Sequence, residues 1–191
     1  MPEITIRPAR NLTGAVRPPG DKSISHRYAI LCSLADGESL LENYSTGADC
    51  RSTLRCFESL GVQVSFEEAG VRIQGAGLRG LKALAGDLDA GNSGSTIRMM
   101  SGILAAQPFA SRIGGDASLS RRPMQRVIDP LQQMGARIQA GEKGRPPLEF
   151  SPAGAPLRGI TYRLPVASAQ VKSCLLLAGL YAQGETVAVE P

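Results

Sequence analysis

The amino-acid sequence predicts a mixed α/β fold of the α+β kind, built from repeated β-α-β-α-β-β units, two complete and a third truncated. Two observations predict it. Three loops rich in glycine, serine or asparagine each precede an apolar helical pattern that carries a basic residue in its first turns, and similar strand and helix patterns follow each loop. The basic residues Arg27, Arg98 and Lys172 are separated by 71 and then 74 positions, a period longer than that of common solenoid modules.

The first unit contains two helical patterns and a hairpin. Its second helix is expected to end at Leu60-Gly61, because glycine suits the left-handed conformation of a helix C-cap. Beyond that cap the apolar residues alternate, which is typical of paired strands. The predicted elements are a helix over 24–34, a strand at 39–42, a helix over 54–60 and a hairpin of 62–66 with 71–73.

The second unit repeats this order, and the third begins it. Met134-Gly135 matches the first cap, and the chain reaches Pro191 before a second helix of the third unit, so we expect an incomplete architecture. The predicted elements are helices over 97–104 and 127–134, a strand at 111–113, a hairpin of 136–138 with 148–150, and then a helix over 171–178 and a strand at 186–189.

The three loops are candidate anion sites. Small residues let the backbone approach a ligand closely, and the first amides of a helix lack internal partners and lie at its positive end. Three such sites in one chain predict a small, highly charged anionic substrate. The loops span 19–27, 91–98 and 166–172.

Composition excludes several other classes. The net charge of +4 is spread along the chain without a lysine-rich tail, which disfavours a nucleic-acid partner. Cys32, Cys50, Cys56 and Cys174 form no C-x-x-C pair, and His26 is the single histidine, so no metal site is expected. We find no leader-like or membrane-length apolar run and therefore expect a cytoplasmic location and no membrane partner.

Four motifs resemble those of the 5-enolpyruvylshikimate-3-phosphate synthase family, in order and across essentially the whole chain. The first and last are similar to the family's second class, which is often discussed for tolerance to the inhibitor glyphosate. The motifs are Gly-Asp-Lys-Ser-Ile-Ser-His-Arg at 20–27, Gly-Asn-Ser-Gly-Ser-Thr-Ile-Arg at 91–98, Arg-Arg-Pro-Met at 121–124 and Ser-Ala-Gln-Val-Lys at 168–172.

The resemblance implies a transferase of aromatic amino-acid biosynthesis. It would move the enolpyruvyl group of phosphoenolpyruvate onto the 5-hydroxyl of shikimate 3-phosphate and release phosphate, by addition and elimination without a cofactor. The family has two domains of three units each. By that resemblance, residues 1–19, with a strand at Ile4–Arg7, join the second domain, and 20–191 form an incomplete first domain that binds shikimate 3-phosphate. The second domain is expected to be missing or supplied by a partner chain, so the isolated chain is expected to be inactive.

The resemblance also implies roles for individual residues. Ser23 and Arg27 would hold shikimate 3-phosphate together with Ser168 and the backbone amide of Ala169, and Gln170 would contact both substrates. A guanidinium group suits bidentate capture of phosphate or carboxylate.

The remaining implied residues surround phosphoenolpyruvate. Lys22 would lie between both substrates as the catalytic cation, Arg122 would bind phosphoenolpyruvate, and the amide of Gly94 would line its pocket. Because some glyphosate-insensitive members carry alanine at the position of Gly94, this chain is expected to have room for glyphosate. The carboxylates that move protons would come from the second domain.

Two alternatives stay open at this point. One is the related enolpyruvyl transferase that acts on UDP-N-acetylglucosamine, which usually has a reactive cysteine in the loop that here spans 114–120 without one. The other is a non-catalytic binding half of a split enzyme.

Among single residues, His26 is read as a packing or helix-surface histidine, Arg98 as a brace for loop carbonyls, and Arg121 and Lys172 as peripheral charges.

Overall fold

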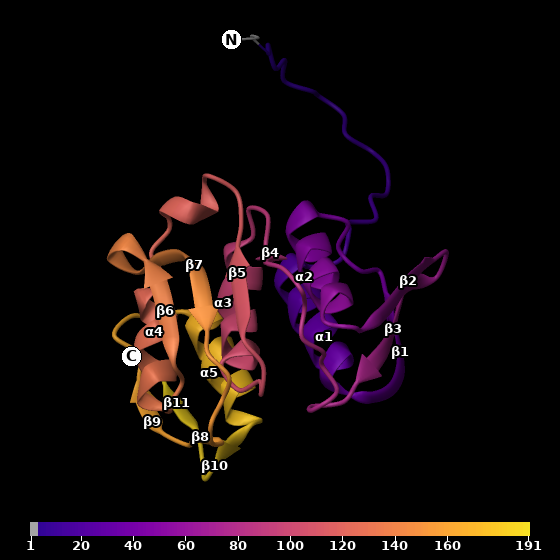
Figure 1. Ribbon diagram of the computed structural model, residues 1–191. Helices are drawn as coiled ribbons and strands as arrows, with labels where there is room; N and C mark the ends of the chain where they lie inside the picture. Colours follow the sequence, from indigo (N-terminus) through magenta and orange to yellow (C-terminus); the bar gives the residue numbers. More distant parts are fainter. Residues whose placement is uncertain (1–3) are drawn as a thin grey trace.

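The computed structural model describes residues 4–191 as a mixed α/β fold, which confirms the predicted class (Figure 1). Its helices are α1 (Lys22–Leu34), α2 (Ala48–Ser59), α3 (Gly94–Leu104), α4 (Gln125–Gln133) and α5 (Ala169–Gly179), with the short 3-10 helices η1 (Leu119–Arg121) and η2 (Glu142–Gly144). Its strands are β1 (Asp36–Glu42), β2 (Gln63–Glu67), β3 (Gly70–Ala76), β4 (Leu88–Asp89), β5 (Ser111–Gly114), β6 (Ile138–Gly141), β7 (Arg145–Phe150), β8 (Leu157–Arg158), β9 (Thr161–Arg163), β10 (Ala182–Gln183) and β11 (Val187–Val189).

The first unit forms an antiparallel sheet in the order β1-β3-β2, against which α1 and α2 pack. The predicted hairpin is confirmed, because Val64 lies opposite Ile73 and Phe66 opposite Val71. Gly61 follows α2 with a φ of 91°, as expected of a left-handed cap. Gly70 begins β3 with a φ of 154°, and a Cβ there would overlap the carbonyl of Leu41 on β1, so glycine is required at this position.

The second unit repeats this topology in the sheet β4-β5-β7-β6. In both units the strand after the first helix pairs with the second strand of the hairpin, since β1 pairs with β3 and β5 with β7, both antiparallel. Within the second hairpin the predicted pairing is confirmed at Ile138, which lies opposite Phe150, whereas Ala136 precedes β6 and is not part of the strand.

The third unit contributes two small parallel pairs, β8 with β10 and β9 with β11. In sequence order one strand of each pair precedes α5 and the other follows it, as β4 precedes α3 and β5 follows it. The second and third units therefore each open with a β-α-β segment. The described part of this unit ends after β11.

Helix α3 lies at the centre of the packing. It is buried along most of its length and contacts α5 closely. The close approach requires Gly102, because a Cβ there would overlap the carbonyl oxygen of Cys174 on α5. Aliphatic and methionine side chains dominate this core, as Ile97, Met100 and Leu104 on α3 show with no exposed surface.

The N-terminal segment differs from the expectation of a strand at Ile4–Arg7. Residues 4–19 form no helix or strand, and they extend away from the body of the fold (Figure 1). Ile4 and Ile6 are 84% and 88% exposed. The physical reason is that a strand needs a neighbour for its backbone hydrogen bonds, and no described element lies beside this segment. Residues 1–3 of the predicted 1–19 segment lie outside the described residues.

Candidate functional site

Each of the three predicted loops opens a helix, as the sequence indicated. The N-cap side chain accepts a hydrogen bond from the backbone amide three residues later in all three cases, which fixes where each helix starts. The caps are Asp21 to Ile24 N at 2.8 Å, Ser93 to Thr96 N at 3.1 Å and Ser168 to Val171 N at 3.4 Å.

The first two amides of each helix are left for a ligand. A helix N-terminus has amides without intrahelical partners, and the side-chain cap satisfies only one of them. Within residues 4–191 no acceptor is found for the amides at the first two positions of α1, α3 or α5, and the positive end of each helix dipole favours an anion there. These amides belong to Lys22 and Ser23, Gly94 and Ser95, and Ala169 and Gln170.

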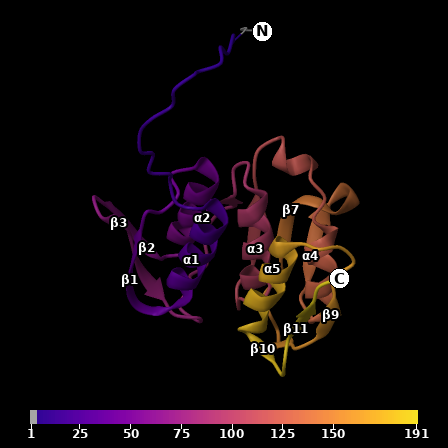
Figure 2. The ribbon, with the colours of Figure 1, turned by 180° about the vertical axis from the view of Figure 1, so that it is seen from behind.

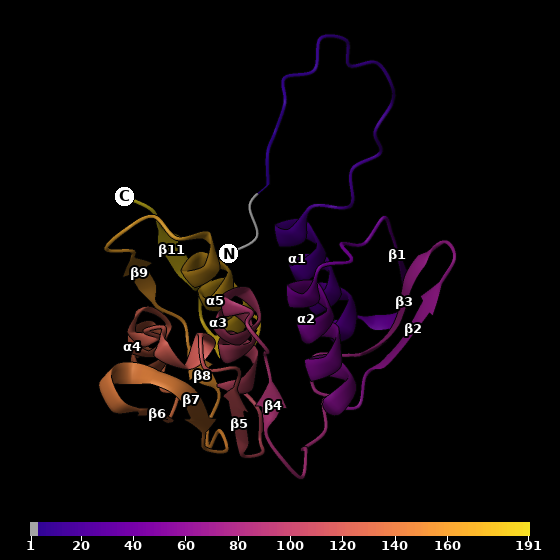
Figure 3. The same ribbon diagram turned by 90° about the horizontal axis from the view of Figure 1, so that it is seen from above.

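Side-chain contacts hold the three helix starts together. Arg27 on α1 donates from Nε to Ser173 Oγ at 3.0 Å and from Nη2 to the carbonyl of Ala169 at 3.2 Å, both on α5. Gln170 on α5 donates from Nε2 to Ser95 Oγ on α3 at 2.9 Å. Figure 2 shows these three helices in one view, and Figure 3 looks down on the molecule from above. The loops, distant in sequence, therefore form one site.

Three arginines at this site lack carboxylate partners. Within the described part of the chain, no ion pair involves Arg27, Arg98 or Arg122, although other basic residues are paired. Burial lowers the pKa of Arg98 below its ordinary value, and the neighbouring Arg122 and Arg126 charges lower it further. Positive charge gathered without compensation stabilises a bound anion.

Arg98 braces the surrounding loops, as expected. Its Nη1 donates to the carbonyl of Gly94 at 3.3 Å and to Gln170 Oε1 at 3.0 Å, and its Nη2 donates to the carbonyl of Pro123 at 3.3 Å. The same guanidinium therefore joins the start of α3, the start of α5 and the Arg-Pro segment.

Arg122 is oriented by neutral groups. Its Nη2 donates to Asn92 Oδ1 at 2.6 Å, and the Asn92 amide donates to Asp116 Oδ2 at 2.6 Å. The Asn92 hydrogen bond, followed by the backbone amides of Leu119 and Ser118, holds the pKa of Asp116 below its usual range. Sequence reasoning missed Asn92 and Asp116 as positioning groups. Asn92 lies inside a recognised motif, but nothing local indicates that it meets Asp116.

Lys22 has a partner that the sequence did not reveal. Its Nζ lies 3.0 Å from Asp49 Oδ2 on α2, and its side chain is 57% exposed. An anion that binds the Lys22 ammonium group therefore shares this group with the Asp49 carboxylate. The two residues are 27 positions apart, and only the packing of α1 against α2 brings them together.

Gly94 lies between two of these cations. A Cβ at this position would come 2.6 Å from Nη1 of Arg98 and 3.3 Å from Nη1 of Arg122. The absence of a side chain therefore keeps open the space in front of both guanidinium groups.

The other residues singled out from the sequence divide into buried and peripheral groups. His26 is completely buried, which confirms the packing interpretation and excludes the helix surface. Arg121 is exposed, and Lys172 Nζ lies 2.9 Å from Glu190 Oε2, as peripheral charges would. Ser23 is exposed, and its carbonyl accepts from Arg27 at 2.9 Å.

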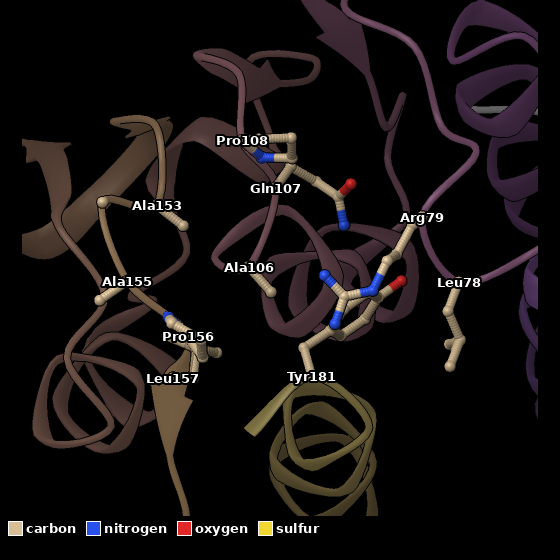
Figure 4. A pocket seen from close by; sticks show the side chains of 11 residues that line it. Leu78, Arg79, Ala106, Gln107, Pro108, Ala153, Ala155, Pro156, Leu157 and Tyr181 are labelled. Atoms are coloured by element: carbon tan, nitrogen blue, oxygen red, sulfur yellow. The ribbon is translucent and has the colours of Figure 1, made fainter. Parts of the chain in front are cut away.

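A separate hollow of about 370 Å³ lies at the opposite ends of α3 and α5 (Figure 4). Arg79, Gln107 and Tyr181 supply its polar groups among mainly small apolar side chains. The negative ends of two helix dipoles point to this region, which disfavours an anion there.

Within residues 4–191, no helix combines the length and apolar character of a membrane span.

Comparison with known proteins is consistent with the arrangement. The family described as EPSP synthase (3-phosphoshikimate 1-carboxyvinyltransferase) matches residues 6–191. The 3-phosphoshikimate 1-carboxyvinyltransferase of Solibacter usitatus is 62% identical over 97% of this chain and 43% of its own length, and that of Alkalilimnicola ehrlichii is 54% identical over 99% and 42%. A solved EPSP synthase from Acinetobacter baumannii superposes with a TM-score of 0.87 at 50% identity, covering 91% of this chain and 39% of that structure. The chain thus spans less than half the length of these relatives.

Proposed function

The chain belongs to the EPSP synthase family, and from this premise we propose that its 191 residues form the shikimate-3-phosphate-binding part of a 3-phosphoshikimate 1-carboxyvinyltransferase. One observation carries the proposal. Three helix starts with unpartnered amides converge on Arg27, Arg98 and Arg122, none of which has a carboxylate partner within residues 4–191. Such a site fits a ligand with more than one negative group.

The reaction proposed for the whole enzyme transfers the enolpyruvyl group of phosphoenolpyruvate to the 5-hydroxyl of shikimate 3-phosphate, with release of phosphate. Each substrate carries a phosphate and a carboxylate, so bringing them together concentrates negative charge that fixed cations must offset. Addition and elimination at the enolpyruvyl carbon needs proton transfer. We assign that step to carboxylates of a second domain, since the acidic groups at this site are engaged in binding Lys22 and Asn92.

Shikimate 3-phosphate is proposed to lie between the starts of α1 and α5. Ser23 and Arg27 come from α1, and Ser168, the Ala169 amide and Gln170 come from α5. The hydrogen bonds of Arg27 to Ala169 and Ser173 support this pairing, because they hold the guanidinium at the start of α5. A phosphate there would meet backbone amides and a guanidinium at once.

Phosphoenolpyruvate is proposed to lie at the start of α3. Arg122 would bind it, the Gly94 amide would line its pocket, and Gln170 would contact both substrates. Lys22 is proposed as the catalytic cation between them, exchanging part of its interaction with Asp49 for the substrates. Glyphosate, an anion of similar size, is proposed to fit the same space in front of Gly94.

The domain division is also a proposal. We infer that residues 20–191 belong to the first domain and that residues 1–19 pair with a second domain. The exposed apolar side chains Ile4, Ile6, Leu12 and Val16 support this, since a partner sheet would cover them. We further propose that the enzyme acts in the cytoplasm.

The test is isothermal titration of the 191-residue chain with shikimate 3-phosphate, together with a phosphate-release assay on both substrates. We expect binding without turnover. Arg27→Ala should weaken binding, whereas Arg51→Ala, which removes an exposed arginine on α2, should not. Turnover would refute the assignment of proton transfer to a second domain. No binding by the folded chain would contradict a preformed shikimate 3-phosphate site.

A further inference from the structure

Four buried side chains from three segments form a continuous hydrogen-bonded chain beside the site. His26 Nδ1 lies 2.7 Å from Thr53 Oγ1 on α2, and Thr53 Oγ1 lies 2.8 Å from Thr96 Oγ1 on α3. Thr96 Oγ1 lies 2.8 Å from Ser93 Oγ. All four side chains are 0% exposed. Each of the four side chains has at least one partner in this chain, and such buried hydrogen bonds hold the groups that make them in place.

Both ends of this hydrogen-bonded chain lie next to residues of the anion site. His26 immediately precedes Arg27 on α1. At the other end, Ser93 is the N-cap of α3 and immediately precedes Gly94. The hydrogen-bonded chain therefore connects the part of α1 that carries Arg27 with the start of α3, which would bind the second anion.

We propose that His26 is a positioning residue of this site, whose imidazole, through Thr53 and Thr96, holds the Ser93-capped start of α3 in register with Arg27. The proposal rests on the proposed function for the identity of the ligand. The hydrogen-bonded chain itself is a property of the protein alone, so it can be tested without a ligand.

The unpaired Nε2 of His26 favours one direction along the hydrogen-bonded chain. The Thr96 hydroxyl can donate to Ser93 Oγ or to the carbonyl of Asp49, which lies 3.3 Å away. Thr53 then donates to Thr96, and His26 donates from Nδ1 to Thr53. His26 Nε2 has no partner among residues 4–191. When Nδ1 is the donor, Nε2 carries no proton and only its lone pair is left unpaired. The reverse direction would bury an unpaired N–H, which is rarer in proteins than an under-satisfied acceptor.

Burial favours the neutral form of His26. Burial lowers the pKa of His26 to about 4; Asp49 on α2 raises it, and Lys22 and Arg27 on α1 lower it. The group that α3 contributes to the chain is the neutral hydroxyl of Thr96. A neutral imidazole keeps a single donor, as the chain requires.

Binding measurements test the positioning role. His26→Leu and Thr53→Val each break the chain while keeping an apolar volume, and we expect each to weaken shikimate 3-phosphate binding about tenfold, the scale of one lost hydrogen bond. His26→Asn places a polar group near the position of Nδ1 and should bind within about threefold of wild type. Thr161→Val, an exposed threonine on β9, is the matched control. Wild-type affinity in both folded His26→Leu and folded Thr53→Val would overturn the proposal.

Nitrogen NMR of the imidazole tests the chain directly, because His26 is the single histidine. We expect a neutral ring protonated on Nδ1, and a changed ring signal in Thr53→Val. A ring protonated on Nε2 would overturn the proposal even if the variants fail to fold. If wild type binds no shikimate 3-phosphate while the ring is protonated on Nδ1, the proposed function fails and the hydrogen-bonded chain stands.

Discussion

Arg27 and Ala169 are 142 positions apart, yet the guanidinium Nη2 of Arg27 donates to the backbone carbonyl of Ala169 at 3.2 Å. The contact joins the first and third repeats at the point where α5 begins. Since Arg27 Nε also donates to Ser173, one side chain fixes the spacing of two helix starts. An anion between them would find a site already assembled, which reduces the ordering that binding requires.

Replacing Arg27 by lysine keeps the charge and removes this geometry. An ammonium cannot donate to Ser23, Ala169 and Ser173 in the directions of a planar guanidinium. We expect Arg27→Lys to weaken shikimate 3-phosphate binding between about tenfold and hundredfold, the range for charged hydrogen bonds. Titration calorimetry measures it, with Arg51→Lys as the control for an arginine on an exposed helix face. Equal affinity in Arg27→Lys would show that charge alone is needed.

Adding a methyl group at Gly94 should reduce the space for the second anion. The Cβ would come 2.6 Å from Nη1 of Arg98, and because that atom ends a flexible side chain, the guanidinium would move and the fold would survive. With shikimate 3-phosphate saturating, we expect Gly94→Ala to weaken glyphosate binding by at least about tenfold, the scale of a clash in a tight site. Gly86→Ala is the control, because a Cβ there meets nothing within 4 Å. An unchanged glyphosate affinity would contradict the placement of this pocket.

A methyl group at Gly102 should act on stability. It would overlap the backbone carbonyl of Cys174 and lie 3.2 Å from the amide of Ala178, and neither can move without shifting α5. We expect Gly102→Ala to lower the free energy of unfolding by about 1–3 kcal/mol, the usual cost of overpacking. Urea denaturation measures this loss, again against Gly86→Ala. A midpoint equal to that of the control would mean that α3 and α5 pack less tightly than described.

His26 should make stability depend on pH in a defined window. Its pKa is about 4 in the folded chain against an ordinary value of 6.5, so the unfolded chain binds more protons between these values. The contribution of the neutral His26 to the free energy of unfolding is therefore fully present above about pH 6.5 and is lost as the pH falls towards 4. We expect wild type to lose on the order of 2 kcal/mol more than His26→Asn between pH 7.5 and 4.5.

The check on this pH effect is urea denaturation of both proteins at several pH values. Subtracting the two profiles removes the carboxylate contributions that they share. Parallel profiles for wild type and His26→Asn would show that the imidazole is not held neutral by burial.

Local features of this protein were predictable from its sequence. The opening of a helix within each of the three loops, the glycine caps after α2 and α4, and the pairing of Val64 with Ile73 all agree with the structure, although α1, α3 and α5 begin two to three residues earlier than predicted. Each depends on residues close along the chain: a cap side chain and an amide three positions later, or an alternating pattern across a short turn. The three similar loops also predicted a small, highly charged anionic substrate.

Contacts between polar groups far apart in the sequence were decided only by the tertiary structure. Examples are the pairing of Lys22 with Asp49, the hydrogen bond of Asn92 to Asp116 and the chain from His26 to Ser93. The strand expected at Ile4–Arg7 is not formed either, because strand hydrogen bonds need a neighbour that the described fold does not provide. The physical reason is the same throughout. Sequence periodicity determines which face each helix buries, whereas the approach of α3 to α5 at Gly102 and the packing of α1 against α2 determine which distant polar groups meet.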